Sequence, residues 1–105
     1  MEIGITDIWR EFNIDATKSM RESFGESYCG QEVIASYLDK GEIAMCTFMR
    51  GKDMFSEEHI VRTYVMLTDG KYIWPNTLGY YIRKYNLRLP NDIEEYIIEN
   101  QNESL

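Results

Sequence analysis

The 105-residue chain has little of what most catalytic sites require. It contains a single histidine, His59, and its seven glycines are isolated, so neither common phosphate-binding glycine pattern can be written through them. A cysteine–histidine or serine–histidine pair would have to use His59, which lies at the start of a predicted strand. An exposed histidine at the edge of a strand is the alternative that fits better. We therefore expect no catalytic residues and no enzymatic activity.

Long apolar runs and disulfide frameworks are also missing. No apolar run approaches the roughly 20 residues that span a bilayer. The start, Met1–Gly4, lacks the basic residues and apolar stretch of a secretory signal, so a cytoplasmic location is expected. The two cysteines, Cys29 and Cys46, fit reduced, partly buried thiols better than a disulfide framework.

Metal ligands are few. Asp53, Glu57 and Glu58 share one predicted loop with His59. The ligand spacing of a calcium-binding loop is absent, and a zinc site would need more histidine or cysteine ligands nearby. A solvated loop is the better interpretation, and we expect neither a metal nor another cofactor.

Positive charge is scarce relative to negative charge. The chain has 18 acidic and 11 basic side chains, for a net charge of −7, and the excess is spread along the sequence. An acidic surface repels phosphate, which argues against direct binding to nucleic acid and to anionic membranes. A basic protein partner is compatible, because opposite charges speed encounter. The alternative is that the charge only keeps a small protein soluble.

Periodicity predicts one α+β domain, with a three-stranded antiparallel β-meander flanked by N-terminal and C-terminal helices. The predicted elements are, in order, a helix over Thr6–Phe12, a short helix or a loop within 13–26, a helix over Gln31–Lys40, strands over Glu42–Arg50, His59–Thr68 and Lys71–Trp74, a helix over Leu78–Tyr85, a last helix from Asn91 to Glu99 and a frayed tail over 100–105. At this length the chain has room for one modest core. The helix over Gln31–Lys40 is expected to bury a stripe of Val33, Ile34, Tyr37 and Leu38, and the last helix a stripe of Ile93, Tyr96 and Ile97.

Turn residues refine the middle of this pattern. Asp69-Gly70 reads as the two central residues of a tight hairpin, where both need positive φ. Pro75 cannot donate to a strand ladder and suits the first position of a helix. Asn86 is expected to end the following helix in a left-handed conformation.

Three further expectations concern the helix ends and the first long strand. Gly41 is predicted to end its helix in the left-handed conformation. Glu42–Arg50 is apolar on both alternating sets, which predicts a strand covered on both faces. Asn91 and Glu94 have the spacing of a capping box.

Aromatic residues are abundant, with eight tyrosines, four phenylalanines and two tryptophans. Tyr81 and Tyr85 fall on the predicted core stripe of their helix, whereas Tyr80 points elsewhere, with Arg83 and Lys84 nearby. Core packing explains most of the aromatics, and tyrosine is also enriched at interfaces. Tyr80 is therefore the aromatic candidate for contact with a partner.

Three segments together resemble a known group of proteins. They are Tyr37-Leu38-Asp39-Lys40-Gly41, Thr68-Asp69-Gly70-Lys71-Tyr72-Ile73-Trp74-Pro75 and Tyr80-Tyr81-Ile82-Arg83-Lys84-Tyr85-Asn86-Leu87-Arg88-Leu89-Pro90, with an acidic loop around Asp53 between the first two. Over residues 31–97 the chain resembles small acidic bacterial immunity proteins of polymorphic and contact-dependent growth-inhibition toxin systems. The resemblance implies no enzymatic activity. It implies tight binding to one cognate toxin domain, often a basic nuclease, whose active site the immunity protein covers.

The matched segments form turns, corners and helices, so the resemblance carries over no toxin-contacting residues. Charge and expected exposure give the candidates instead, because loop carboxylates beside the sheet can pair with basic side chains. The predicted partner-binding residues are Asp39, Glu42, Asp53, Glu57, Glu58 and Asp69, together with Tyr80. For each of them a solvated surface group is the alternative. For the whole chain, the alternative function is a small regulatory or adaptor domain that binds another protein or a metabolite.

Overall fold

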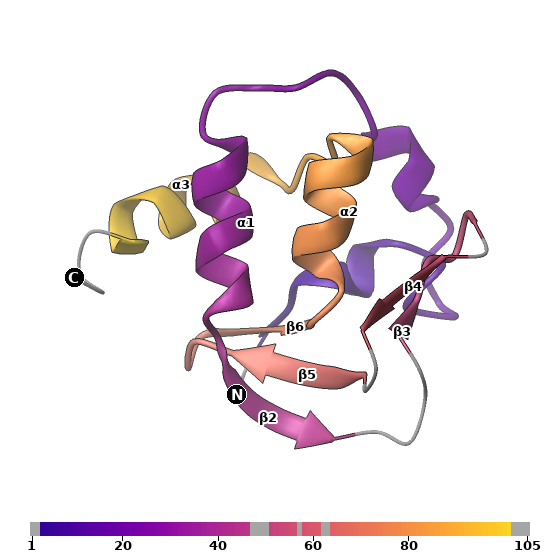
Figure 1. The fold of residues 1–105 in the computed structure, drawn as a ribbon, viewed down its shortest axis with the longest axis horizontal. Coiled ribbons are helices and arrows are strands. Elements are labelled where there is room, and N and C mark those ends of the chain that lie inside the picture. Colours follow the sequence, from indigo (N-terminus) through magenta and orange to yellow (C-terminus); the bar gives the residue numbers. More distant parts are fainter. Residues whose placement is uncertain (1–2, 47–50, 57, 62–63, 102–105) are drawn as a thin grey trace.

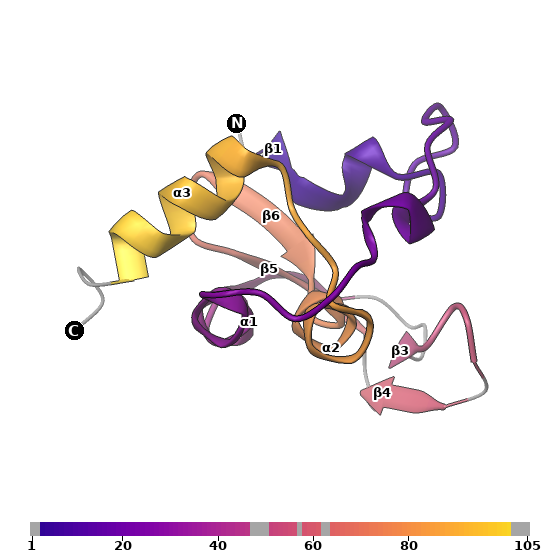
Figure 2. The ribbon, with the colours of Figure 1, turned by 90° about the horizontal axis from the view of Figure 1, so that it is seen from above.

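Two helices stand side by side over a mixed β-sheet in the computed structural model, which describes residues 3–46, 51–56, 58–61 and 64–101 (Figure 1). The elements are β1 (Ile3–Gly4), the 3-10 helices η1 (Ile5–Ile8) and η2 (Met20–Ser23), α1 (Gln31–Asp39), β2 (Glu42–Cys46), β3 (Gly51–Lys52), β4 (His59–Val61), β5 (Val65–Thr68), β6 (Tyr72–Pro75), α2 (Leu78–Tyr85) and α3 (Asn91–Gln101). Seen from above, α1 and α2 are nearly end-on, α3 lies by β6, and the β3–β4 hairpin stands beyond α2 (Figure 2).

The α+β class is confirmed, but the predicted strand arrangement is wrong. The main sheet has four strands in the order β1-β6-β5-β2, and β1 runs parallel to β6. Strands β2, β5 and β6 are antiparallel neighbours, as a meander requires. The predicted strand over His59–Thr68 contains β4 and β5, which belong to different sheets. Sequence alternation could not reveal β1, because a two-residue strand has no periodicity.

The N-terminal segment is less helical than its apolar spacing predicts. Instead of a helix over Thr6–Phe12, the chain forms β1 and η1, and Trp9 is extended immediately after them. Trp9 is nevertheless fully buried, and its indole N–H donates to the Ser23 hydroxyl at 3.3 Å. For 13–26 the alternatives were a short helix or a loop, and the structure has the short 3-10 helix η2 there, with Ser19 as its N-cap.

Gly41 is needed for close packing and not for a left-handed helix end. The predicted left-handed conformation is wrong, because Lys40 ends α1 with φ −96° and Gly41 is not among the glycines with positive φ. A Cβ atom on Gly41 would lie 2.7 Å from Cζ2 of Trp74 and 3.0 Å from Cβ of Leu67. The helix therefore passes into β2 directly against the buried indole.

Strand β2 is exposed along its described length. The predicted coverage on both faces is wrong for 42–46, where all five residues are exposed, including Ile43 (65%) and Met45 (58%). The physical reason is position, because β2 is the last strand of the sheet order and only β5 pairs with it among the described residues. Residues 47–50 of the predicted strand lie outside the described residues.

The turn between β5 and β6 is longer than predicted. Gly70 has φ 98°, whereas Asp69 does not have positive φ, so a two-residue turn centred on Asp69-Gly70 is wrong. The Asp69 carboxylate accepts hydrogen bonds from the backbone N–H groups of Lys71 and Tyr72, at 3.0 and 2.8 Å. Pro75 ends β6 opposite Met66 and is not the first residue of a helix.

The C-terminal helices match their predicted spans closely. Helix α2 covers Leu78–Tyr85, and Asn86 ends it in the left-handed conformation (φ 55°), which confirms both expectations. Helix α3 continues to Gln101, beyond the predicted end at Glu99, and 102–105 lie outside the described residues.

The predicted capping box at the start of α3 is wrong. The buried Glu94 carboxylate accepts from the Leu89 backbone N–H at 2.9 Å and from the Arg88 guanidinium at 2.8 Å. Within the described ranges, none of the helices is long and apolar enough to cross a membrane.

Substitution of Gly41 tests the close packing under α1. We expect Gly41→Ala to lower the free energy of unfolding by about 1–3 kcal/mol, because the added methyl overpacks the Trp74 indole. Chemical denaturation followed by circular dichroism measures the change. Gly25→Ala is the matched control, because no atom lies within 4 Å of a Cβ at Gly25. Equal stability of the two variants would contradict the packing argument.

Candidate functional site

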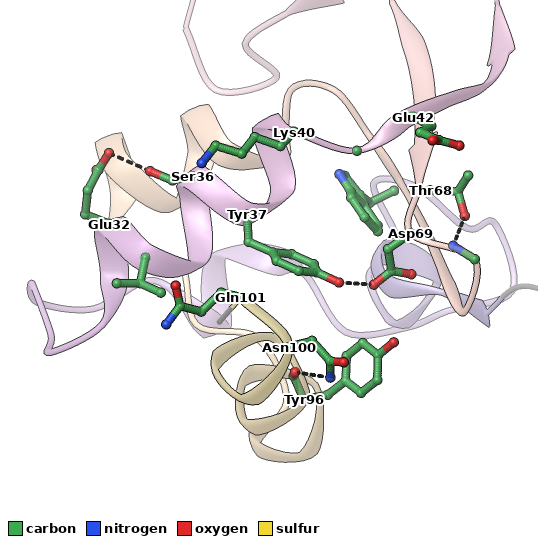
Figure 3. Close-up of a pocket in the computed structure, with 14 residues that line it drawn as sticks. Glu32, Ser36, Tyr37, Lys40, Glu42, Thr68, Asp69, Tyr96, Asn100 and Gln101 are labelled. Atoms are coloured by element: carbon green, nitrogen blue, oxygen red, sulfur yellow. Dashed lines mark hydrogen bonds between the residues drawn. The ribbon is translucent and has the colours of Figure 1, made fainter. Parts of the chain in front are cut away.

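A groove of about 840 Å³ opens between α1, α3 and the turn between β5 and β6 (Figure 3). Its walls include Val33 and Tyr37 from α1, Lys40 at the end of that helix and Tyr96 from α3, and Trp74 of β6 contributes to its base. This volume is typical of sites that bind small molecules or several side chains of a partner. The segments that form the groove are far apart in sequence, and the fold brings them together.

The groove has an aromatic lining. Tyr37 and Tyr96 are half-buried, and the Trp74 ring lies 6.4 Å from the Tyr37 ring, centroid to centroid. The Trp74 indole N–H donates to the Leu38 carbonyl at 3.0 Å, which fixes the indole against α1. Val33, predicted to lie in the buried stripe of this helix, is 39% exposed and borders the groove instead. The lining therefore offers apolar and ring surface to a ligand.

Carboxylates stand at both ends of the groove. Figure 3 shows Glu32 at one end, and Glu42 and Asp69 near the other. The Tyr37 hydroxyl donates to the Asp69 carboxylate at 2.5 Å. Burial and this neighbouring carboxylate raise the pKa of Tyr37, so the phenol stays protonated at neutral pH. Lys40 is the basic residue among the groove's lining residues.

A second group of polar residues lies between the β3–β4 hairpin and α2; we call it the Asp53 cluster, after Asp53, Glu58, Tyr80, Lys84 and Tyr85. Asp53 accepts hydrogen bonds from the Tyr80 and Tyr85 hydroxyls at 2.8 and 2.7 Å, and from the Lys84 ammonium at 3.3 Å. Its side chain is fully buried, so the expectation of an exposed loop carboxylate is wrong for Asp53. The exposed Glu58 carboxylate joins the cluster through an ion pair with the Lys84 ammonium at 2.9 Å.

The Asp53 cluster fastens the hairpin to the body of the protein. The Met54 backbone N–H donates to the Tyr81 hydroxyl at 2.9 Å. Phe55 packs edge-on against Phe24 and Tyr85, with ring centroids 5.3 and 5.7 Å apart. Polar and aromatic contacts therefore converge on a two-stranded unit that pairs with no strand of the main sheet among the described residues. We therefore interpret the Asp53 cluster as a structural feature that holds the hairpin in place.

The structure divides the predicted partner-binding residues into groups. Glu42 and Asp69 border the groove, while Asp53, Glu58 and Tyr80 belong to the Asp53 cluster. Asp39 pairs with Arg83 at 2.7 Å, and Arg83 also holds Glu32 at 2.9 Å. Glu57 lies outside the described residues.

Sequence reasoning missed the groove residues Tyr37 and Tyr96, which it assigned to buried helix stripes. The stripe of α1 is narrower than predicted, because Ile34, Ala35 and Leu38 are its buried members. Val33 and Tyr37, one helical turn apart, form a separate face. The spacing of these two residues, one turn apart and beside the buried stripe, was the signal in the sequence that could have identified the second face.

The residues considered for catalysis or redox chemistry lie apart from the groove. His59 is exposed in β4, and its side chain has no hydrogen bond or ion pair within the described part of the chain. Cys29 and Cys46 are free, and both are exposed, so their predicted partial burial is wrong. In the same part of the chain, histidine, cysteine and acidic side chains form no group of three or more suited to a metal ion.

Comparison of the chain with protein-family models, with curated proteins and with solved structures finds no match. The resemblance to immunity proteins therefore stays a prediction. The groove, with its carboxylates and its aromatic lining, is therefore the feature of the protein from which a function can be inferred.

Substitution of Asp53 tests the role of its cluster. We expect Asp53→Asn to lower the free energy of unfolding by about 2 kcal/mol, because hydrogen bonds from two half-buried tyrosine hydroxyls to a buried, charged acceptor are lost or weakened. Glu58→Gln is the matched control: it changes an exposed partner of the same Lys84 and is expected to leave the stability nearly unchanged. Equal losses in the two variants would contradict a structural role for Asp53.

The wild type and Asp53→Asn together test how the stabilisation by Asp53 depends on pH. Burial alone would raise the pKa of Asp53, but hydrogen bonds from the Phe55 backbone, Tyr85 and Tyr80 outweigh it and lower the pKa from 3.8 to about 2. A lowered pKa in the folded state stabilises the protein above the unfolded value and loses that effect in acid. The stability difference between the wild type and Asp53→Asn should be constant from neutral pH to about 5 and shrink as the pH falls from about 4 to 2.

Proposed function

We propose that this chain is an immunity protein that binds and neutralises a cognate toxin domain. It acts by stoichiometric binding, with no catalysis and no cofactor, and covers the active site of its partner. The partner is a basic protein domain. Support comes from the resemblance of residues 31–97 to immunity proteins and from the acidic groove.

The observation that carries the proposal is the concentration of carboxylates around an aromatic groove. Helix α3, which forms one wall, contains no lysine or arginine. Its exposed acids Asp92, Glu95 and Glu99 follow at i, i+3 and i+7, so they share one side of the helix. Helix α3 therefore adds carboxylates and no cation of its own to the carboxylates that line the groove.

An acidic surface of this kind can bind a partner protein that itself binds nucleic acid. A nuclease holds phosphate with lysine and arginine side chains, and carboxylates can take the same side chains in charge-assisted hydrogen bonds. Tyrosine beside the carboxylates adds the kind of contact that dominates binding energy at protein interfaces. Occupation of the basic groove by this chain would exclude the substrate of the toxin.

The size of the groove favours a second candidate function, a small regulatory or adaptor domain that binds another protein or a metabolite. About 840 Å³ lies within the range of small-molecule sites. Screening of the chain alone against metabolite mixtures by thermal shift discriminates the two. A saturable stabilisation by a small molecule, with no toxin partner, would favour the regulatory function.

Direct binding and growth rescue test the proposed function together. The chain is mixed with the C-terminal toxin domain of a large secreted protein encoded immediately upstream of it. We expect a dissociation constant in the nanomolar range or below, which is about −12 kcal/mol or more favourable, and rescue of cells that express the toxin. Because opposite charges steer the encounter, the association rate should fall as ionic strength rises.

An unrelated basic protein of similar charge is the control, because it separates cognate recognition from charge attraction. Equal affinity for the control protein would contradict a cognate complex. Absence of both binding and rescue would contradict the proposed function itself. An association rate that does not respond to salt would contradict the electrostatic part.

A further inference from the structure

We propose that the groove binds an extended basic segment of the partner, with one arginine or lysine side chain lying across Tyr37 and its charge beside Glu42 and Asp69. The proposal rests on the proposed function for the identity of the partner. The chemistry of the segment follows from the groove.

The Tyr37 ring lacks a contact that most tyrosine rings of this protein make. Most tyrosine rings described in this protein have a cation from the same chain over them: Arg88 over Tyr28 at 4.0 Å, Lys71 over Tyr96 at 4.4 Å and over Tyr72 at 5.3 Å, and Lys84 over Tyr80 at 5.4 Å and over Tyr85 at 5.3 Å. Tyr37 has no such cation among the described residues. Its hydroxyl is fixed by Asp69 and its ring is half-buried in the groove. A cation from a partner can take this position.

Of the three groove carboxylates, only that of Glu42 is not already held by another described residue. Glu32 is already held by Arg83, and Asp69 already accepts from Tyr37 and from two backbone N–H groups. The Glu42 side chain makes no hydrogen bond or ion pair within the described residues, and Glu42 is exposed at the start of β2. Glu42 therefore keeps its full capacity to accept hydrogen bonds from a guanidinium or ammonium group.

The charges of the groove exclude other occupants. Arg83 pairs with Glu32, and Lys40 and Lys71 add positive charge beside Tyr37 and Tyr96, so the excess negative charge of the groove lies at the end that holds Glu42 and Asp69. An anionic group is repelled from that end. A second copy of a chain with net charge −7 is repelled in the same way. A neutral metabolite would leave the acidic end of the groove without a counter-charge. The basic segment is the occupant that fits both the charge and the ring surface.

Titration with a defined peptide tests the proposal on the chain alone. The probe is an acetylated, amidated hexapeptide of alternating arginine and glycine, and the matched control has citrulline in place of arginine, which keeps the shape and removes the charge. Nuclear magnetic resonance of the ¹⁵N-labelled protein locates binding. The backbone amides expected to shift are those of Ser36, Tyr37, Thr68, Asp69, Gly70 and Asn100.

Saturable shifts at these amides with the arginine peptide, absent with the citrulline peptide, would support the proposal. Absence of shifts with the arginine peptide would overturn it. Shifts confined to the outer face of α3, at Asp92, Glu95 and Glu99, would also overturn it, and so would equal binding of the citrulline peptide. Shifts that depend on protein concentration without peptide would assign the groove to a second copy and reject the basic segment.

Two charge variants sharpen the test. Glu42→Gln should weaken the peptide about three-fold, the effect of one exposed ion pair. Asp15→Asn removes the same charge from an exposed residue that lines no part of the groove, and should leave the affinity nearly unchanged, because salt screens an exposed charge outside the site. Equal weakening by both variants would show diffuse attraction and overturn the proposal.

Two ring variants separate the tyrosine ring from its hydroxyl. Tyr37→Phe keeps the ring and should retain most of the binding, whereas Tyr37→Leu should lose it. Unchanged amide signals away from the groove confirm that each variant is folded. Equal affinity of the two folded variants would overturn the role of the ring, and if Tyr37→Leu does not fold, the comparison of Glu42→Gln with Asp15→Asn decides.

The toxin domain then distinguishes this proposal from the proposed function. If the toxin domain binds and rescue occurs, but Glu42→Gln changes neither the affinity nor competition by the arginine peptide, the groove proposal fails and the proposed function stands. If the arginine peptide occupies the groove but the toxin domain neither binds nor causes rescue, the proposed function fails and the groove remains a site for basic segments.

Discussion

The position of one indole ring constrains much of the structure. Trp74 is 1% exposed in β6, and its N–H donates to the Leu38 carbonyl at the C-terminal end of α1. The ring lies so close to the turn from α1 into β2 that Gly41 has no room for a Cβ atom. The same ring meets Tyr37, so one side chain sets the angle between helix and sheet and forms the base of the groove.

Many of the carboxylates are used to hold the fold and are not free for a partner. The buried Asp53 holds the β3–β4 hairpin on α2, and the buried Glu94 of α3 holds the backbone of Leu89 in the preceding connection. Asp39 and Glu58 pair with the exposed cations Arg83 and Lys84. In the described part of the chain, no buried side-chain nitrogen or oxygen lacks a hydrogen-bond partner. A net charge of −7 therefore overstates the surface available for recognition, and the groove with the outer face of α3 accounts for much of what remains.

The sequence predicts the periodic elements well and the tertiary arrangement poorly, for physical reasons. Helices α1 and α2 and the left-handed Asn86 follow from apolar spacing and turn chemistry, which are local. Strand β2 looked covered on both faces, because apolar composition does not tell an edge strand from a central one. Asp53 looked like a loop carboxylate, because the tyrosines that bury it lie 27 and 32 residues further along the chain. The groove has the same origin: its walls meet only after folding.

Asp69 and Glu42 stand at the same end of the groove but differ in how freely they can change. The Asp69 carboxylate holds two backbone N–H groups of its turn and the Tyr37 hydroxyl, so its replacement would alter the turn as well as the charge. Glu42 is exposed and supports nothing else among the described residues, so substitution there changes the charge of the groove without a cost to folding. If the groove receives a basic segment, Asp69 supplies a fixed charge that belongs to the fold, and Glu42 supplies the one that can be adjusted to the partner.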